Sequence, residues 1–359
     1  MEEYDWMWLC CIPGFAERDR KRLLKLYGSP ENIRRAAKSS MEESGLTQAK
    51  IRRIKEHQKN FDAAGEYHKF EKQGIKFISS IHREYPEALR QIWDYPSGLF
   101  YIGRIPEKTE MCIALVGARM CSGYGRQTAD KLASCLAERG VSVVSGMAFG
   151  IDAAAQSACV RAGGKSYGIL GCGVDVCYPR ENYELYEKLK EHGGIISEYP
   201  PGTQPLPYHF PMRNRIISGL SKTVVVVEAR KKSGTLITAD MALEQGRDVY
   251  AVPGRMDDPL SEGCNRLIRQ GAGILNDFED FLEESGCPPK DVQIRQKSKL
   301  VLATPENLVY SCLDSQSKSL QQIAGECKLP VQQTMQALCS LQIRGMIEEN
   351  AKNYYAKTR

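Results

Sequence analysis

Short apolar runs alternate with helix-length segments through the middle of the chain. The runs 112–116, 141–144, 167–170 and 223–227 are each followed by a loop rich in Gly and Ser and then by a longer segment. Apolar runs of this length, bounded by such loops, are typical of strands that are buried on both faces. Strands that alternate with helices predict an α/β fold, in which helices cover both faces of a parallel sheet.

The first block of the chain, residues 1–70, has helical patterning instead. Helices are expected at 20–27 and 48–59, and Ser29 followed by Pro30 starts another between them. Ser is a good helix N-cap, and Pro fits the first helical position. The block therefore resembles a small SAM-like or helix-hairpin-helix bundle. Such a bundle either contacts the DNA backbone or serves as a docking or dimerisation module with a solvated basic face.

The alternating pattern defines a second block, residues 71–285. Two strand-like pieces at its start, 75–78 and 98–101, are expected to extend the sheet. Residues 286–300 are polar after two prolines, which is typical of a linker.

The third block, residues 301–359, follows the order helix, helix, helix, hairpin, which suggests a winged-helix-like domain. In such domains the third helix usually enters DNA. Here that helix, 331–343, exposes three glutamines and has no Lys or Arg before Arg344. A protein contact is therefore at least as well supported as a DNA contact.

Composition and charge exclude few classes of protein. The chain is 42% hydrophobic and 26% charged with a net charge of +5, which permits a nucleic-acid partner without requiring one. The N-terminus is acidic and lacks the pattern of a signal peptide, and no apolar run approaches the roughly 20 residues that span a bilayer. We therefore expect a cytoplasmic protein with no membrane contact.

The 13 cysteines and five histidines do not indicate a metal site or a disulfide framework. No Cys-x-x-Cys pair occurs, and the histidines do not cluster with the cysteines. Reduced thiols are the simpler interpretation for a chain of this size. We therefore expect no metal and no cofactor.

The loops that follow the predicted strands carry glycines, hydroxyls and arginines. Ligands of parallel sheets bind at the carboxyl ends of the strands, where backbone N–H groups and helix N-termini attract anions. Arginine binds phosphate bidentately, and aromatic rings stack on bases. Several phosphate sites beside aromatics favour a single-stranded polynucleotide over a mononucleotide. The candidate residues are Gly117, Arg119, Tyr124, Gly125, Ser145, Gly146, Phe149, Gly150, Gly171, Gly173, Tyr178, Arg180, Phe210, Arg213, Asn214, Arg215, Ser233, Gly234 and Thr235.

Simpler interpretations exist for each of these residues. Any one glycine loop can be a tight chain reversal. Arg213 or Arg215 can be a buried arginine that ties the sheet to its neighbour, Phe210 can belong to the core, and Asp152 can be a local cap. The recurrence of such loops at four successive strand ends favours the functional interpretation.

The well-known phosphate and nucleophile motifs do not fit. The loop after 112–116 lacks the Gly-x-Gly-x-x-Gly spacing, and the loop that starts at Gly171 has Val176 in place of the third glycine. The segment 163–166 resembles a P-loop ending, but Cys159 stands where its first glycine belongs. No Gly-x-Ser-x-Gly elbow occurs, and no catalytic residue is expected.

Six ordered segments resemble the motif set of the DNA-processing protein A family (DprA, also called Smf). They are 116–119 with 124–125, 145–152, 170–175 with 178–179, 210–220, 233–236 and 252–254. The resemblance implies an extended Rossmann-like domain that binds single-stranded DNA without enzymatic turnover. It also implies a homodimer that loads the recombinase RecA onto incoming single strands in natural transformation and displaces or tolerates single-strand binding protein.

The resemblance also assigns individual residues. Arg119 is the arginine of the first motif, and Phe210, Arg213, Asn214 and Arg215 belong to the Phe-Pro-x-Arg-Asn-Arg motif. The chain has Ala118 where many members have Ser. No motif marks the surfaces for RecA or for the dimer.

Two other functions compete with DNA binding. A phosphoribohydrolase of the lysine-decarboxylase-like type shares a Gly-Thr phosphate loop, and Glu228 or Glu244 would be its carboxylate. Its motif is broken here, because Thr238 stands where its glutamate would fall. A scaffold that binds only protein is the third possibility.

Overall fold

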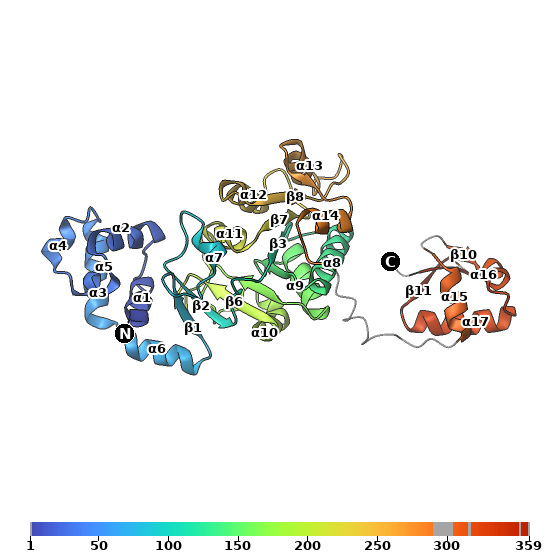
Figure 1. The fold of residues 1–359 in the computed structure, drawn as a ribbon, viewed down its shortest axis with the longest axis horizontal. Helices are drawn as coiled ribbons and strands as arrows, with labels where there is room; N and C mark the ends of the chain where they lie inside the picture. The colour runs from blue at the N-terminus through green and yellow to red at the C-terminus, as the bar shows by residue number, and fades with distance from the viewer. Residues whose placement is uncertain (1, 290–303, 315–316, 352, 358–359) are drawn as a thin grey trace. The chain divides into compact units, whose positions relative to one another are not determined.

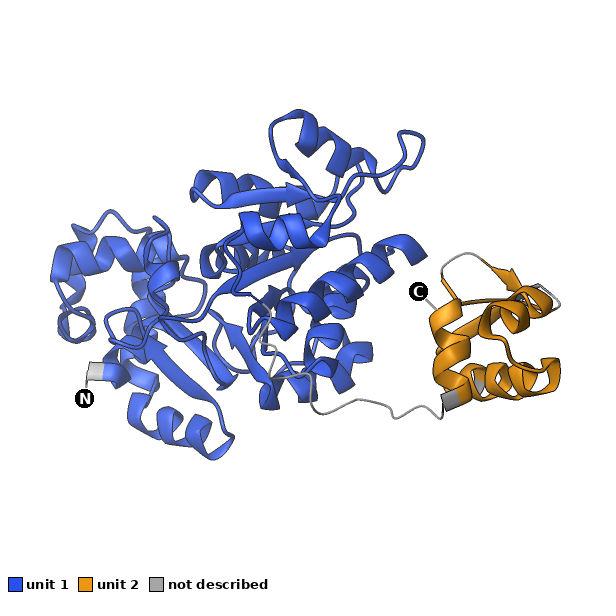
Figure 2. Cartoon of the chain, turned by 45° about the vertical axis from the view of Figure 1, so that its right-hand side comes forward, with its two compact units in different colours: residues 1–291 blue, residues 292–359 orange. Residues whose placement is uncertain are grey.

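The computed structural model describes residues 2–289, 304–314, 317–351 and 353–357. The chain forms two compact units, residues 1–291 and 292–359, which are described separately (Figure 2).

A nine-stranded sheet runs through the first unit in the order β1-β2-β6-β5-β4-β3-β7-β8-β9 (Figure 1). The strands from β6 to β9 along this order are parallel, and β2 joins β6 antiparallel. The strands are β1 (Lys76–Ser79), β2 (Gly98–Gly103), β3 (Cys112–Val116), β4 (Ser142–Ser145), β5 (Ser166–Ile169), β6 (Gly193–Ser197), β7 (Thr223–Val226), β8 (Asp248–Ala251) and β9 (Gly273–Ile274).

Helices cover both faces of this sheet, as the sequence pattern predicts. Cys112, Ala114 and Val116 of β3 pack into one apolar cluster, while Ile113 and Leu115 point into another on the opposite face. All five are buried, which is typical of strands in doubly covered parallel sheets. The helices are α7 (Glu87–Arg90), α8 (Gly123–Glu138), α9 (Ile151–Arg161), the short 3-10 helix η1 (Arg180–Asn182), α10 (Tyr183–Glu191), α11 (His209–Leu220), α12 (Gly234–Glu244), α13 (Glu262–Arg269) and α14 (Phe278–Glu284).

The strand order reverses between β3 and β7. From β3 the chain adds β4, β5 and β6 on one side, and then returns through α11 to add β7, β8 and β9 on the other. Loops that leave β3 and its neighbours at this point diverge, which opens a crevice at their carboxyl ends. The topology therefore places a ligand site beside the end of β3.

The helical block at the N-terminus is confirmed. Ser29 accepts a hydrogen bond from the Asn32 N–H as expected for an N-cap, and Thr47 caps α5 in the same way. The block shares an apolar cluster with Phe100 of the sheet, so it packs against the sheet directly. Its helices are α1 (Glu2–Cys10), α2 (Glu17–Tyr27), α3 (Pro30–Arg35), α4 (Lys38–Glu42), α5 (Gln48–Asn60) and α6 (Ala63–Lys72).

His57 makes the stability of this block depend on pH. It is buried, its Nε2 lies 3.0 Å from the Trp8 carbonyl oxygen, and its ring lies 4.4 Å from that of Phe61. Burial lowers the His57 pKa, and the contact with Trp8 only partly opposes this. As the pH falls, the unfolded chain takes up a proton at this histidine near pH 6.5, which is a higher pH than the folded protein requires.

We therefore expect the free energy of unfolding to decrease as pH falls from about 6.5 toward the lower folded pKa of His57, and to level off below it. Urea denaturation at a series of pH values measures this slope. The His57→Phe variant should lose most of the slope in this window. An equal slope in both proteins would contradict the assignment.

The second unit has the element order expected of a winged-helix-like domain. The third helix spans the expected residues, and Ser319 forms a capping box with Gln322 at the start of the second. The small sheet has three antiparallel strands rather than the expected two, because β10 pairs with β12. The elements are α15 (Thr304–Cys312), β10 (Lys318–Ser319), α16 (Leu320–Cys327), α17 (Val331–Ile343), β11 (Ile347–Ala351) and β12 (Tyr354–Lys357). The expected linker falls largely outside the described residues.

Among the residues that the structure describes, no helix combines the length and the apolar character needed to cross a bilayer.

Candidate functional site

A cleft of about 530 Å³ opens at the point where the strand order reverses. We call it the strand-end cleft. It lies at the carboxyl ends of β3, β4 and β7 and is bounded by α11 and the start of α12. Its lining residues are Val116, Gly117, Arg119, Ala148, Asp152, Tyr178, Pro207, Phe210, Pro211, Arg213, Asn214, Ile217, Lys232, Ser233, Gly234, Thr235, Ile237 and Thr238.

Arg119 and two aromatic rings form one wall of the strand-end cleft. The Arg119 guanidinium lies over the Phe210 ring, 5.7 Å from its centroid, and the Tyr178 ring lies 5.4 Å from that of Phe210. Arg119 is exposed and forms no ion pair within the described ranges of the chain. Its charge is therefore available to an anion, beside rings that can stack on a base.

The N-terminus of α12 also lines the strand-end cleft. Ser233 caps the helix by accepting from the Thr235 N–H, and the Thr235 hydroxyl donates to the Gly117 carbonyl at 3.1 Å. A Cβ added at Gly234 would meet open space, so the helix end faces the cleft without cover. Lys232 also lines the cleft. Free N–H groups at a helix end, with a nearby ammonium, suit a phosphate.

Arg213 forms part of the cleft floor and is buried. Its Nη1 donates to the Gly146 carbonyl at 2.9 Å and to the Ile169 carbonyl, so it joins the ends of β4 and β5. Burial lowers the Arg213 pKa to about 10, and the negative charge of Asp152 opposes this. Burial also raises the pKa of Asp152, against the effect of Arg213. Arg213 still carries a proton at neutral pH and adds positive potential beneath the cleft.

The balance of charge in the strand-end cleft is positive. Arg119, Arg213 and Lys232 line it, and Asp152 is the single carboxylate among the lining residues. Within the described part of the chain, no group of His, Cys, Asp and Glu side chains could hold a metal ion. The cleft is suited to binding an anion that also carries flat rings.

Comparison with known proteins decides the family. The family model for DNA recombination-mediator protein A matches residues 76–286. This range includes all nine strands of the large sheet. The chain belongs to this family. DprA and Smf are names of its members, and the membership places the chain among the proteins of DNA recombination.

Relatives and solved structures agree with this assignment. The DNA processing protein DprA of Bacillus subtilis (strain 168) is 43% identical over 225 residues, which cover 62% of this chain and 75% of the relative. Protein Smf of Escherichia coli (strain K12) is 38% identical over 272 residues, covering 73% and 72%. The X-ray structure of DprA from Streptococcus pneumoniae has 36% identity and a TM-score of 0.68, covering 79% of this chain and 98% of that one.

A solved structure of DprA from Helicobacter pylori concerns the single-stranded DNA binding mode of that protein. It is 27% identical to this chain with a TM-score of 0.53, and the match covers 58% of this chain and 94% of the Helicobacter chain.

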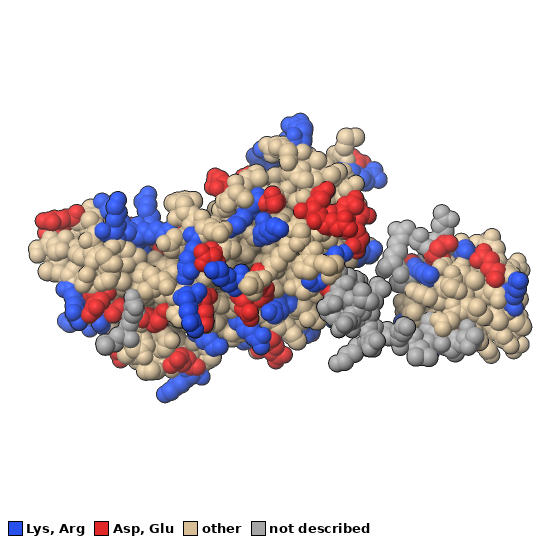
Figure 3. Space-filling view, in the orientation of Figure 1, with Lys and Arg blue, Asp and Glu red and all other residues tan. Residues whose placement is uncertain are grey.

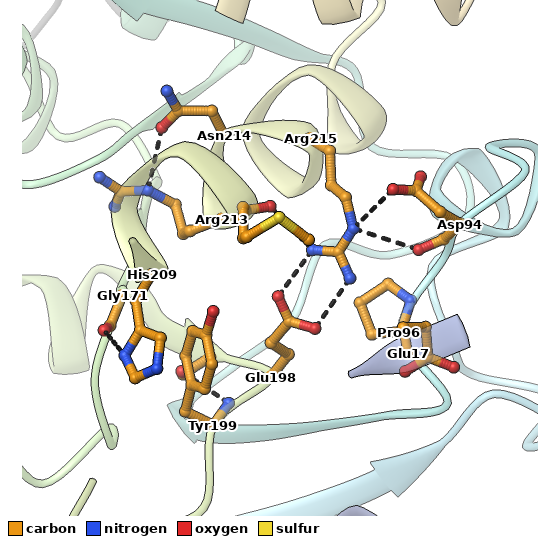
Figure 4. A network of polar contacts seen from close by, with 12 residues as sticks. Glu17, Asp94, Pro96, Gly171, Glu198, Tyr199, His209, Arg213, Asn214 and Arg215 are labelled. Carbon is orange, nitrogen blue, oxygen red and sulfur yellow. Dashed lines mark hydrogen bonds and ion pairs between the residues drawn. The ribbon is translucent and has the colours of Figure 1, made fainter. Parts of the chain in front are cut away.

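Arg215 of this DprA-family chain points away from the strand-end cleft. It leaves α11 in a different direction from Arg213 (Figure 4). Its guanidinium bonds both carboxylate oxygens of Glu198, at 2.6 and 2.8 Å, and its Nε lies 3.0 Å from Asp94. Only 2% of Arg215 is exposed. Burial opposes its charge, but Glu198 and Asp94 outweigh burial and raise the Arg215 pKa.

The expected direct contact of Arg215 with DNA therefore does not fit this geometry. Each of its three guanidinium nitrogens already donates to a protein oxygen, and reaching a phosphate would require the ion pairs to open. The simpler interpretation, a buried arginine that ties α11 to its neighbours, describes Arg215 better.

Several expected residues shape the loops instead of facing the cleft. A Cβ at Gly150, where φ is +77°, would overlap the Ala118 carbonyl oxygen, and a Cβ at Gly125 would overlap the Glu228 carboxylate. The Ser145 hydroxyl is fully buried and donates to the Leu115 carbonyl at 2.6 Å. Gly171 and Gly173 are also buried. These contacts show that the residues hold the loops in shape, and their expected contact with DNA stays a prediction.

Of four other expected residues, two lie beside the cleft and two do not line it. Phe149 and Gly146 line a small hollow that adjoins the cleft beside Arg119 and Tyr178, and 41% of Phe149 is exposed. Tyr124 and Arg180 are exposed but do not line the cleft.

Glu228, a carboxylate considered for an enzyme, is occupied. It is 2% exposed and accepts hydrogen bonds from the Ser122 N–H and hydroxyl. Glu244, the other candidate, is the last residue of α12, whereas the first turn of that helix lines the cleft. Neither carboxylate is among the residues that line the strand-end cleft.

Lys232 and the pair of Arg213 with Asp152 were not among the residues predicted for the site. Lys232 could have been found, because a lysine directly before a Ser-Gly-Thr helix start lies beside the helix N-terminus. The pair comes from segments far apart in sequence, and no local pattern marks it.

Proposed function

We propose that the strand-end cleft binds single-stranded DNA. The observation that carries this proposal is that Arg119, Phe210 and Tyr178 line the same cleft as the open N-terminus of α12. Phosphates would bind Arg119, Lys232 and the helix end. Bases would stack on the aromatic rings, and each such stack contributes about 1–3 kcal/mol. Such contacts read no sequence, so binding is expected to be sequence-tolerant.

The family supports a wider role for the bound strand. We propose that the chain acts without enzymatic turnover, as a homodimer that loads RecA onto single strands and works alongside single-strand binding protein. DprA relatives and the Helicobacter structure support the DNA part of this proposal. Arg215 acts in it as a positioning residue, because it holds the helix that carries Phe210.

Binding to oligonucleotides of increasing length tests the function. We expect the affinity for labelled dT oligomers to rise with length until the site is filled, with a salt slope near −0.7 per phosphate neutralised. Fluorescence anisotropy at several salt concentrations measures both. Binding that is already complete with a mononucleotide would contradict the proposal and point to a nucleotide-binding enzyme.

A further inference from the structure

The helical block contains an internal repeat. α1, a glycine turn and α2 form one unit, and α4, a glycine turn and α5 form the second, with α3 between them. Gly14 and Gly45 precede α2 and α5 by the same number of residues, and both have φ near +70°. Each is followed by a buried apolar residue, Phe15 or Leu46. The block is therefore a pair of helix-hairpin-helix units.

The two units contact each other reciprocally. A Cβ at Gly14 would overlap the guanidinium of Arg53 from the second unit, and a Cβ at Gly45 would overlap that of Arg22 from the first. Arg22 and Arg53 occupy equivalent positions in α2 and α5. The turn of each unit thus contacts the same arginine of the other unit, and reciprocal contacts of this kind are typical of a two-fold axis. The units are thus related by an approximate two-fold.

An ion pair crosses between the units as well. Asp19 and Lys50 are equivalent third residues of α2 and α5, and their charged groups lie 2.6 Å apart. Leu23 and Ile54, also equivalent, are both fully buried. The repeat is therefore present in the core as well as in the turns.

Both turns present the same polar groups to solvent. Gly14 and Gly45 are exposed, and neither donates its N–H in a hydrogen bond within the described chain. Arg22 and Arg53 are exposed and make no ion pair with a described carboxylate. Each turn thus offers a free N–H beside a free guanidinium, which are the groups that proteins use on nucleic-acid phosphates.

Positive charge extends around the turns. Arg18, Lys25 and Arg52 are exposed as well. Lys and Arg side chains project from the edge of the helical block over α2, with acidic side chains at the far end of the block (Figure 3). Glu42 and Glu43, at the end of α4, are exposed acids near the second turn. Their negative charge opposes an anion at this turn, whereas Arg22 and Arg53 attract one.

We propose that this pair of turns binds the backbone of double-stranded DNA. The two strands of a duplex are related by two-fold axes, so two equivalent phosphate-binding turns can each take one strand. The contact involves only phosphates and is independent of sequence. It uses residues outside the strand-end cleft and does not depend on the function proposed for that cleft.

Duplex binding by the full chain tests this proposal. The probe is a blunt-ended duplex without single-stranded ends, and the variant is Arg22→Gln with Arg53→Gln. We expect duplex affinity to fall about tenfold or more and the salt slope to become shallower by about two, while dT binding stays unchanged. The double variant Lys59→Gln with Lys72→Gln, which removes two exposed charges elsewhere in the block, should keep duplex affinity.

Three results would overturn the proposal. They are no duplex binding by the wild type, an equal loss in the control variant, and a loss of dT binding in place of duplex binding. The Arg119→Gln variant separates the two sites, since it should keep the duplex contact while it loses the single strand. Melting temperatures of all variants confirm that they are folded.

Discussion

Replacing Arg119 with Gln is expected to weaken single-stranded DNA binding about tenfold to a hundredfold. The guanidinium is exposed, forms no ion pair with a described carboxylate and lies over the Phe210 ring. A hydrogen bond to a charged group contributes about 1.5–3 kcal/mol, and each 1.4 kcal/mol is about a factor of ten in affinity. Fluorescence anisotropy with a dT oligomer at fixed salt measures the loss.

Arg104→Gln is the matched control for this variant. Arg104 is also exposed, but it follows β2 beside Gly193, at the amino end of the parallel strands and thus at the edge opposite the cleft. Its loss should change affinity only slightly. If both variants lose the same affinity, the effect comes from net charge, and the strand-end cleft is not the site.

Replacing Arg215 with Met is expected to lower the free energy of unfolding by about 3–5 kcal/mol, because it leaves the buried Glu198 carboxylate without its ion-pair partner. Glu198 is 7% exposed and accepts two hydrogen bonds from Arg215. The Asp94 carboxylate forms a second ion pair, with the Nε of Arg215. Chemical denaturation measures the change.

Arg247→Met provides the comparison for the Arg215 variant. Arg247 donates to the carbonyls of Ala88 and Gly219 but forms no ion pair in the described residues. Its loss should cost only about 0.5–1.5 kcal/mol. Adding Glu198→Gln to Arg215→Met should restore part of the stability, because the two residues interact directly. A loss for Arg215→Met no larger than that for Arg247→Met would contradict the structural role.

The parallel sheet could be predicted because its central strands are buried on both faces and therefore read as continuous apolar runs. β6 was missed, since Gly193 and Gly194 begin it and only two β-branched residues follow. That strand depends on pairing with β5 on one side and β2 on the other. α1 was missed because it is buried around most of its circumference, so it shows no polar stripe.

The candidate site was predicted less completely than the fold. Arg119, Phe210 and Tyr178 do line the cleft. The motif contains both Arg213 and Arg215 and does not say which of them faces the cleft. Each residue turns an α-helix by about 100°, so these two side chains point about 200° apart and only one of them can face it. Which of them faces the cleft depends on Glu198 and Asp94, which lie in other segments of the chain.

Photo-crosslinking of the bound strand tests the central claim most directly. A dT oligomer that carries 4-thiothymidine is irradiated with the full chain, and mass spectrometry identifies the crosslinked peptides. We predict crosslinks at Phe210 and Tyr178, with Phe149 at the rim, and their loss in the Arg119→Gln variant. Crosslinks confined to the helical block or to residues 304–357 would show that the single strand binds elsewhere and would contradict the account.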